Sequence, residues 1–454
     1  MRVVAGLLMG QFGMFVRRVD LFVLLLCVVV LCPSMVPAAN PQPVQIGSRR
    51  ELMIDDFLVD SLGGAAKHQL HHPVRREIAI VHDASWEGNG GNYHTVFFDE
   101  GYKGTGRYRM YYHAWHIPSD GNQGHPLYIA YAESEDGVHW VKPKLGLVEH
   151  DGSKANNIVI GTINGQQGHD FSVFKDTNPR VAKGEEYKAV GFGSNPAGLY
   201  AFKSSDGLHW SLYNQAKPVM TGHPFDTQNI AFWDPNIGKY RAYIRDFEGN
   251  RRDIKMATSD DFVHWSKRVW LKYPHAPSEQ LYTNQIQPYY RAPHLFIGFP
   301  ARYIERPWSK SHEALPLREH REMRLRAKQR YGTALTDTLF MTSRDGVHWD
   351  RRFMEAFLRP GPDSDNWTDR NMYIGVGIVP TGPAEMSIYF MEHYKHASIR
   401  LRRGTLRIDG FVSVNAPYSG GAFVTRPLTF AGGELVINYA TSVAGGMRVE
   451  IQDV

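Results

Sequence analysis

The sequence predicts an all-β protein: a five-bladed β-propeller followed by a small C-terminal β appendage. The first observation is a short tag that contains Asp, His and Trp and occurs four times in the 454 residues. The second is a set of three alternating apolar runs before each copy. The third is a fifth unit that keeps the runs without the tag. Five units of about four strands each are typical of a propeller. The copies of the tag are Ser134–Trp140, Ser204–Trp210, Thr258–Trp265 and Thr342–Trp349.

The runs before each tag have the two-residue period of half-buried strands. The fifth unit shows the same pattern, and we expect its fourth strand at Phe411–Val414. In the first unit the runs are Tyr93–Phe98, Tyr108–Tyr112 and Leu127–Tyr131, and in the fifth they are Met372–Val379, Met386–Phe390 and Ile399–Arg402.

The tag itself favours a structural role. Its Asp-Gly pair is typical of a tight turn, in which Asp caps its own backbone and Gly takes a positive φ. Phe262 replaces Gly in the third copy, so the turn tolerates other residues. We therefore expect the tag to form the hairpin between the third and fourth strands of a unit, with its Trp packed between blades.

The N-terminus resembles a targeting segment, residues 1–39. Arg17 and Arg18 precede the apolar run Leu21–Leu31, and small residues follow as far as Ala39. This order predicts a cleavable signal peptide and a secreted or periplasmic protein, with an uncleaved anchor as the alternative. Both cysteines lie inside the segment, so we expect no thiol chemistry in the mature chain.

The remaining chain is expected to divide into a propeller over residues 40–416 and an appendage over residues 417–454. Strands are predicted at Glu434–Asn438 and Met447–Ile451 in the appendage. Glu51–Val59 is expected to be a strand that closes the ring or packs on the appendage. The charged insertion at His312–Arg330 predicts a helix with a solvated face.

The composition limits the classes of molecule that the protein is expected to bind. The net charge is +5 and no block of Lys or Arg stands out, so nucleic acid is not expected. The many His residues suit carbohydrate binding, acid–base chemistry or metal binding. The spacing of the His residues does not indicate a metal site, and we expect no cofactor. No stable membrane partner is expected after signal cleavage, and the oligomeric state is not predicted.

Strand direction limits where chemistry can occur. Because the strands of a blade are antiparallel, the start of the first strand and the loop between the second and third strands share one face. We call the segment that leads into each first strand the entry. Each entry carries a carboxylate, and we predict Glu87, Asp170 and Asp226 as the catalytic acids. Glycoside hydrolysis needs one protonated and one ionised carboxyl group, a division that crowded acids provide.

Other polar and aromatic residues near the entries are candidates for sugar binding. The arginines among them could recognise a carboxylate or sulfate on an acidic sugar. The predicted binding residues are Trp86, Asn92, His94, His169, Asn229, Asn284, Arg291, Arg302, Asp369, Arg370 and Glu392.

From about Glu51 to Ala416 the chain resembles the five-bladed propeller glycoside hydrolases, which include invertase-like fructosidases and arabinanase-like enzymes. It is most similar to secreted bacterial proteins of the glycosyl hydrolase family 32-like group, through Leu281–Asn284, Arg291–His294 and Leu406–Val414. The resemblance implies that acids of the first three blades act as base or nucleophile, transition-state stabiliser and general acid.

Two other functions remain open. The Trp-Met-Asn-Asp-Pro entry of the invertase-like enzymes is absent, which favours a non-catalytic carbohydrate-binding propeller as the first alternative. The second alternative is a polysaccharide lyase that uses Tyr, His and Arg to remove a proton next to a uronate. The main hypothesis is an exported glycoside hydrolase acting on a polysaccharide or its oligosaccharides.

Overall fold

The computed structural model describes residues 2–6, 42–116, 124–163, 165 and 168–453. It is mostly β, which confirms the predicted class. Two compact units are present: residues 71–411, and residues 1–70 together with 412–454. The predicted targeting segment lies outside the described residues, except for the strand β1 (Arg2–Gly6). No helix in the described part of the chain is long and apolar enough to cross a membrane.

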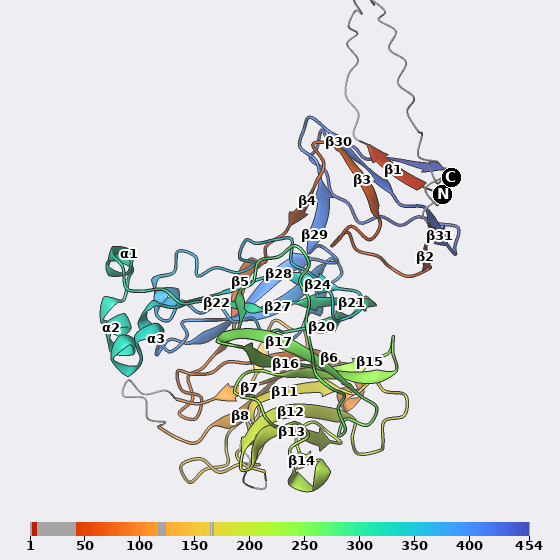
Figure 1. Ribbon diagram of the computed structural model, residues 1–454. Helices are drawn as coiled ribbons and strands as arrows, with labels where there is room; N and C mark the ends of the chain where they lie inside the picture. The colour runs from red at the N-terminus through yellow and green to blue at the C-terminus, as the bar shows by residue number, and fades with distance from the viewer. Residues whose placement is uncertain (1, 7–41, 117–123, 164, 166–167, 454) are drawn as a thin grey trace, which may run out of the picture. The chain divides into compact units, whose positions relative to one another are not determined.

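The unit of residues 71–411 contains five successive antiparallel sheets within the described ranges, numbered first to fifth in chain order (Figure 1). The first three are β6 (Thr95–Asp99), β7 (Arg107–Ala114), β8 (Tyr128–Ser134), β9 (Trp140–Val141) and β10 (Ile158–Ile160); β11 (His169–Lys175), β12 (Tyr187–Ser194), β13 (Ala197–Ser204) and β14 (Ser211–Leu212); β15 (Ile230–Asp234), β16 (Lys239–Glu248), β17 (Arg251–Ser259) and β18 (Val269–Trp270). The last two are β20 (Gln287–Tyr289), β21 (Ala292–Gly298), β24 (Met341–Ser343) and β25 (Trp349–Asp350); and β26 (Val379–Gly382), β27 (Glu385–Glu392), β28 (Arg400–Arg407) and β5 (Val74–Val81). A closed propeller of five blades stays a prediction.

The outer strand of the fifth sheet differs from the prediction. Strand β5, from before the first sheet, pairs with β28. The expected strand Phe411–Val414 instead contributes β29 (Val412–Asn415), which pairs with β4 (Lys67–Leu70) in the other unit. The fifth sheet begins at β26, and Met372–Ile378 makes only isolated bridges. The prediction failed because the partner of β28 lies more than 300 residues away in sequence.

The second unit is built from segments of both termini. Strand β3 (Val59–Gly64) pairs with β30 (Gly421–Thr425), and β1 lies between β30 and β32 (Arg448–Gln452). Strand β2 (Val44–Gly47) pairs in parallel with β31 (Leu428–Phe430). Strand β32 confirms one predicted appendage strand. The other, Glu434–Asn438, is not a strand, and its side chains are exposed, so they lack the buried face that strand pairing usually provides.

Apolar cores lie between consecutive sheets. Tyr111 of the first sheet packs with Phe171 of the second, and Val190 of the second packs with Trp233 of the third. Another core joins the first and fifth sheets through residues such as Met110 and Leu401. Burying these side chains stabilises the fold by roughly 1.5–3 kcal/mol for each large one.

The tags form the hairpins between third and fourth strands, as predicted. In each copy the Asp Oδ1 accepts two backbone N–H groups at 2.7–2.9 Å. The Asp Oδ2 lies 2.6–2.7 Å from the His Nδ1. In three copies the carbonyl of the tag Gly accepts a hydrogen bond from a Tyr hydroxyl of another sheet, which is the preceding sheet for the second and fourth copies and the fifth sheet for the first copy. These pairs are Tyr389 with Gly137, Tyr111 with Gly207, and Tyr243 with Gly346.

The third tag departs from this pattern at two matched positions. The preceding sheet has Val190 where the other sheets have the Tyr, and the tag has Phe262 in place of Gly. Phe262 is fully buried and packs in the same core as Val190. The phenyl ring of Phe262 therefore fills the space that a Tyr side chain occupies where the other tags contact their neighbouring sheets.

The close approach of the Tyr explains why Gly is needed. At Gly346, which has φ +79°, a Cβ would lie 2.5 Å from both Tyr243 Oη and Arg241 Nη1. Gly346→Ala is expected to lower the free energy of unfolding by about 1–3 kcal/mol more than Gly238→Ala. Gly238 is the matched control, because it has φ +61° and no atom within 4 Å of the added Cβ. Urea unfolding of both variants checks the difference, and equal losses would contradict the packing argument.

The predicted helical insertion forms α1 (Lys310–Ala314), α2 (Arg318–Ala327) and α3 (Gln329–Thr333), which lie together in Figure 1. The helices lie between two strands of a small sheet, β22 (Ala301–Ile304) and β23 (Leu335–Thr338), and β19 (Gln280–Leu281) pairs with β22. The expectation of a solvated face is wrong for two arginines, since Arg321 and Arg324 are buried. Arg321 donates to backbone carbonyls of the α1 region, including His312 O at 2.5 Å.

Candidate active site

The entry of the second sheet brings Asp170 beside two histidines. His169 Nδ1 lies 2.6 Å from Asp170 Oδ2. His113 Nε2, from the end of β7, accepts the Asp170 backbone N–H at 2.6 Å. The Asp170 side chain is fully buried, whereas that of His169 is 31% exposed. Asp170 is therefore placed behind His169, and His169 reaches solvent.

The protonation of this pair follows from its surroundings. Burial raises the pKa of Asp170, and the charge of Asp226 adds to that rise against the opposing effect of His169. Neither carboxyl oxygen of Asp170 has a well-directed hydrogen-bond partner among the described residues. For His169, burial disfavours the charged form, but Asp170 and Asp226 outweigh it and raise the pKa above 6.5. The pair therefore keeps a proton to a higher pH than a free imidazole does.

Asp226, at the entry of the third sheet, is the exposed acid of the group. Its side chain is 58% exposed and forms an ion pair with the buried guanidinium of Arg245. Arg245 also donates to Pro224 O at 2.9 Å and lies 5.4 Å from the ring centre of Tyr282. Asp226 contributes to the pKa shifts of Asp170 and His169, so the three groups share one electrostatic environment.

Four tyrosines from the first, fourth and fifth units surround this group. Tyr93 packs 5.2 Å from His113 and 6.1 Å from Tyr373, measured between ring centres. Tyr373 in turn lies 6.1 Å from Tyr282 and 5.5 Å from Tyr394. Burial raises the pKa of all four phenols, so they are neutral at physiological pH.

Asp369, from the fifth unit, lies on one side of the candidate active site formed by His169, Asp170, Asp226 and the four tyrosines. Its buried carboxylate accepts hydrogen bonds from Arg324 of α2 at 3.1 and 3.2 Å, and contacts His320 and Lys395 at 3.4 and 3.6 Å. Burial opposes ionisation of Asp369, but Lys395, His320 and Arg324 outweigh it and lower its pKa to about 2. Asp369 is therefore an ionised structural anchor for the helical insertion.

Buried amides join the entries of three sheets. Gln228 donates to Tyr93 O at 3.0 Å and to Thr95 Oγ1 at 3.2 Å, and accepts from Gln285 at 3.0 Å. The entries of the first, third and fourth units thus meet in one hydrogen-bonded layer. Such a fully satisfied buried network fixes relative positions.

Backbone strain marks the same region. Tyr93, Asp170, Arg370, His393 and Lys395 all have φ between +54° and +65°. A positive φ is costly for residues other than Gly, and such conformations cluster at functional sites. Five strained residues in the entries and in the loop after β27 therefore support a functional role for this end of the sheets.

Glu87 lies apart from the other two predicted catalytic acids. Its buried carboxylate accepts hydrogen bonds from Tyr112 Oη at 2.6 Å, Lys142 Nζ at 2.7 Å and the Ala84 N–H at 3.0 Å. Tyr112 and His113 are neighbours on β7 and point to opposite faces of the sheet. Glu87 on the Tyr112 side is therefore separated by the strand from Asp170 on the His113 side.

Five of the predicted sugar-binding residues instead make internal contacts near the entries. Asn229 and Asn284 brace backbone groups, including Phe225 O and Tyr243 O. His94 is buried against Tyr112 and lies 3.3 Å from His82, and burial lowers its pKa. The Trp86 indole donates to Asn157 at 2.7 Å. Asn92 is buried, and its backbone carbonyl accepts the His113 N–H.

The predicted arginines and Glu392 are engaged by other groups. Arg302 pairs with Asp337 at 2.6 Å and with Glu279 at 3.1 Å, and Arg370 donates to three backbone carbonyls. Glu392 contacts three arginines, among them Arg400 at 3.0 Å. The expected place of Arg291 is corrected: it lies in the turn between β20 and β21, at the tag end of the sheet, where it pairs with Asp409 at 2.9 Å.

Comparison with known proteins gives one family match. Residues 102–282 match the model described as "Glycosyl hydrolases family 32 N-terminal domain". The chain resembles glycosyl hydrolases of family 32. This confirms the resemblance inferred from the repeats and, with it, the expected enzyme class, a glycoside hydrolase. Asp170, Asp226 and Arg245 lie inside the family 32-like part, and Glu87 lies before it.

Among curated proteins no match is found. Similar solved structures include an N-acetylgalactosamine deacetylase from F. plautii, at 14% identity and TM-score 0.48. The match covers 76% of this chain and 96% of the deacetylase chain. A glycosyl hydrolase from Bacteroides ovatus follows at 12% identity and TM-score 0.42, with 77% and 96% covered. A fructofuranosidase from Schwanniomyces occidentalis has 13% identity and TM-score 0.40, with 77% and 60% covered. None of these similarities is close enough to indicate a substrate.

Sequence reasoning missed several residues of the candidate active site. Tyr373, Tyr394 and Lys395 follow entry or loop positions, but nothing in their spacing distinguishes them from strand residues. Arg324 was hidden by the charged pattern of α2. The one usable signal was the pair Asp369-Arg370, which ends three residues before Tyr373 and so places charge near an aromatic residue at a predicted entry.

Proposed function

We propose that this chain is an exported glycoside hydrolase whose five sheets are the five blades of a propeller. The proposed active site lies where the entries meet. His169, held by Asp170, gives the proton to the leaving oxygen, and Asp226 acts as the ionised base or nucleophile. The observation that carries the proposal is the proton-holding His169–Asp170 pair that shares its environment with the exposed carboxylate of Asp226.

The division of roles follows from charge and exposure. A general acid must be protonated at working pH, and the raised pKa of His169 meets that need. The partner group must be ionised and must reach the sugar, and Asp226 is exposed and paired with Arg245. Asp170, which is fully buried, acts as a positioning residue. Tyr282, beneath the Arg245 guanidinium, offers a ring on which the C–H face of a sugar can stack.

A glycan panel tests this function. We expect the full-length protein to release reducing sugar from at least one fructan, arabinan or other plant or algal polysaccharide, without a product absorbing near 230 nm. That absorbance on uronate polymers would favour the lyase alternative. Binding on a glycan array with no product after prolonged incubation would favour the non-catalytic alternative. Either outcome would contradict the proposal.

A further inference from the structure

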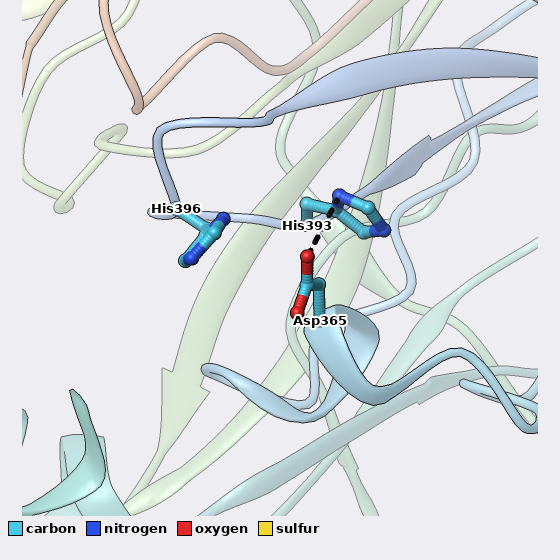
Figure 2. Close-up of side chains that lie close together, drawn as sticks. All are labelled: Asp365, His393 and His396. Carbon is cyan, nitrogen blue, oxygen red and sulfur yellow. Dashed lines mark ion pairs between the residues drawn. The ribbon is translucent and has the colours of Figure 1, made fainter. Parts of the chain in front are cut away.

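A group of potential metal ligands lies next to the candidate active site. Asp365 of the 3-10 helix η3 (Ser364–Trp367), His393 after β27 and His396 in the following loop each offer one ligand atom, and these atoms lie within 4.8 Å of one another. Figure 2 shows Asp365 facing His393, with His396 beside them. Two imidazoles and one carboxylate are the donor set typical of Zn²⁺ and similar divalent transition metals.

The orientation of His393 fits this use. Its Nδ1 lies 3.9 Å from the Asp365 carboxylate, while its Nε2 lies 3.0 Å from Asp363 Oδ2. Asp363 is itself held by Arg400 at 2.8 Å and by the Asp365 N–H at 3.1 Å. Metal-bound histidines usually donate their second ring N–H to such a fixed carboxylate, which sets the tautomer and the ring orientation.

We propose that Asp365, His393 and His396 bind one divalent transition metal of the Zn²⁺ class. The nearby cations do not oppose this, because Arg400 pairs with Asp363 and Glu392, and Lys395 pairs with Asp369. The ligand atoms need to move together by about an ångström to meet the 2.0–2.2 Å bond lengths of zinc.

The Ser398 hydroxyl occupies the space between the two imidazoles. It lies 2.7 Å from the Nδ1 atoms of both His393 and His396. The hydroxyl therefore has to turn away when the metal binds. The bound metal fixes the loop of residues 393–396, which carries Tyr394 and Lys395 to the Asp369 side of the active site.

Cobalt titration of the full-length protein tests the site, because Co²⁺ in a four-coordinate protein site absorbs visible light much more strongly than hydrated Co²⁺ does. The Cys27→Ser, Cys32→Ser background removes competing thiols. We expect one equivalent to bind, and Zn²⁺ to displace it. His396→Ala and, independently, the isosteric Asp365→Asn are expected to weaken Co²⁺ binding by about 100-fold or more. Ser398→Ala is expected to keep the binding.

His264→Ala is the matched control, since His264 lies 2.6 Å from Asp261 in an exposed tag and forms a His-Asp pair outside the cluster. Circular dichroism checks that each variant is folded. The proposal is overturned if the parent protein binds no Co²⁺, if both ligand variants bind it as the parent does, or if the His264→Ala change causes the same loss.

Discussion

Replacing Asp226 with asparagine is expected to lower kcat by about 10²–10⁴-fold on the glycan identified in the panel. The amide keeps the size of the side chain but supplies no charge to act as base or nucleophile. Asp226 is exposed and its partner Arg245 also donates to Pro224 O, so the fold is expected to survive. Initial rates of the folded variant, normalised to protein concentration, measure the effect.

The Asp170→Asn variant separates the positioning role from the catalytic one through the pH profile. Because Asp170 raises the pKa of His169, removing its charge lowers that pKa. Activity requires protonated His169, so it falls as pH rises through this pKa. We therefore expect the alkaline limb of kcat/KM to move to lower pH in the variant, with a lower kcat at neutral pH.

Glu87→Gln is the control for both variants, because Glu87 is a carboxyl group on the other side of β7. It matches Asp170 in burial, whereas Asp226 is exposed. The Glu87→Gln change is expected to lower stability, since Lys142 loses a buried charge partner, while the folded fraction keeps its turnover. Full activity of folded Asp226→Asn, or a loss of turnover in folded Glu87→Gln, would contradict the assignment.

The largest loss of stability is expected from Asp369→Asn. The change leaves the buried Arg324 and Lys395 without a countercharge, and breaking a buried ion pair in this way costs about 3–5 kcal/mol. Urea unfolding at pH 7 measures the difference. Asp260→Asn is the control, because Asp260 pairs with Lys239 at 3.1 Å on the surface, where such pairs contribute about 0–1 kcal/mol.

The same residue gives stability a pH dependence. The folded pKa of Asp369, about 2, lies below its ordinary value of 3.8. Its contribution is therefore complete above pH 4 and is lost as pH falls towards 2. The gap in stability between the parent and Asp369→Asn should narrow over that range. A gap that stays constant from pH 7 to pH 2 would show that the carboxylate charge is not its cause.

Local patterns predicted most of the sheets. The tag predicts a hairpin because the contacts of its Asp, with nearby backbone N–H groups and with the His, all lie within the tag itself. The alternating runs before the tag are long enough to be recognised as strands. Strand β5 and the β29–β4 pair could not be predicted in the same way. Their partners are set by which sheet edge remains open once the rest of the chain has folded, and no local pattern carries that information.

The site was predictable as a region and less so as a set of roles. Strand parity correctly brought His169, Asp170 and Asp226 to one end of the sheets. The alternation of side chains along β7 was not considered for Glu87. Its contact with Tyr112 places it on the other side of the strand from Asp170. Asp369 was found by position, but its role depends on Arg324 from a helix whose buried side cannot be read from a strongly charged sequence.

The matched exchange of Val190 and Phe262 means that the repeats are not interchangeable modules. Each tag is fitted to the sheet that it contacts, so a unit copied to another place in the chain would bring a phenyl ring against a tyrosine, or a glycine against an empty space. Shuffled or circularly permuted versions should therefore tolerate new chain ends in loops far better than a new order of units.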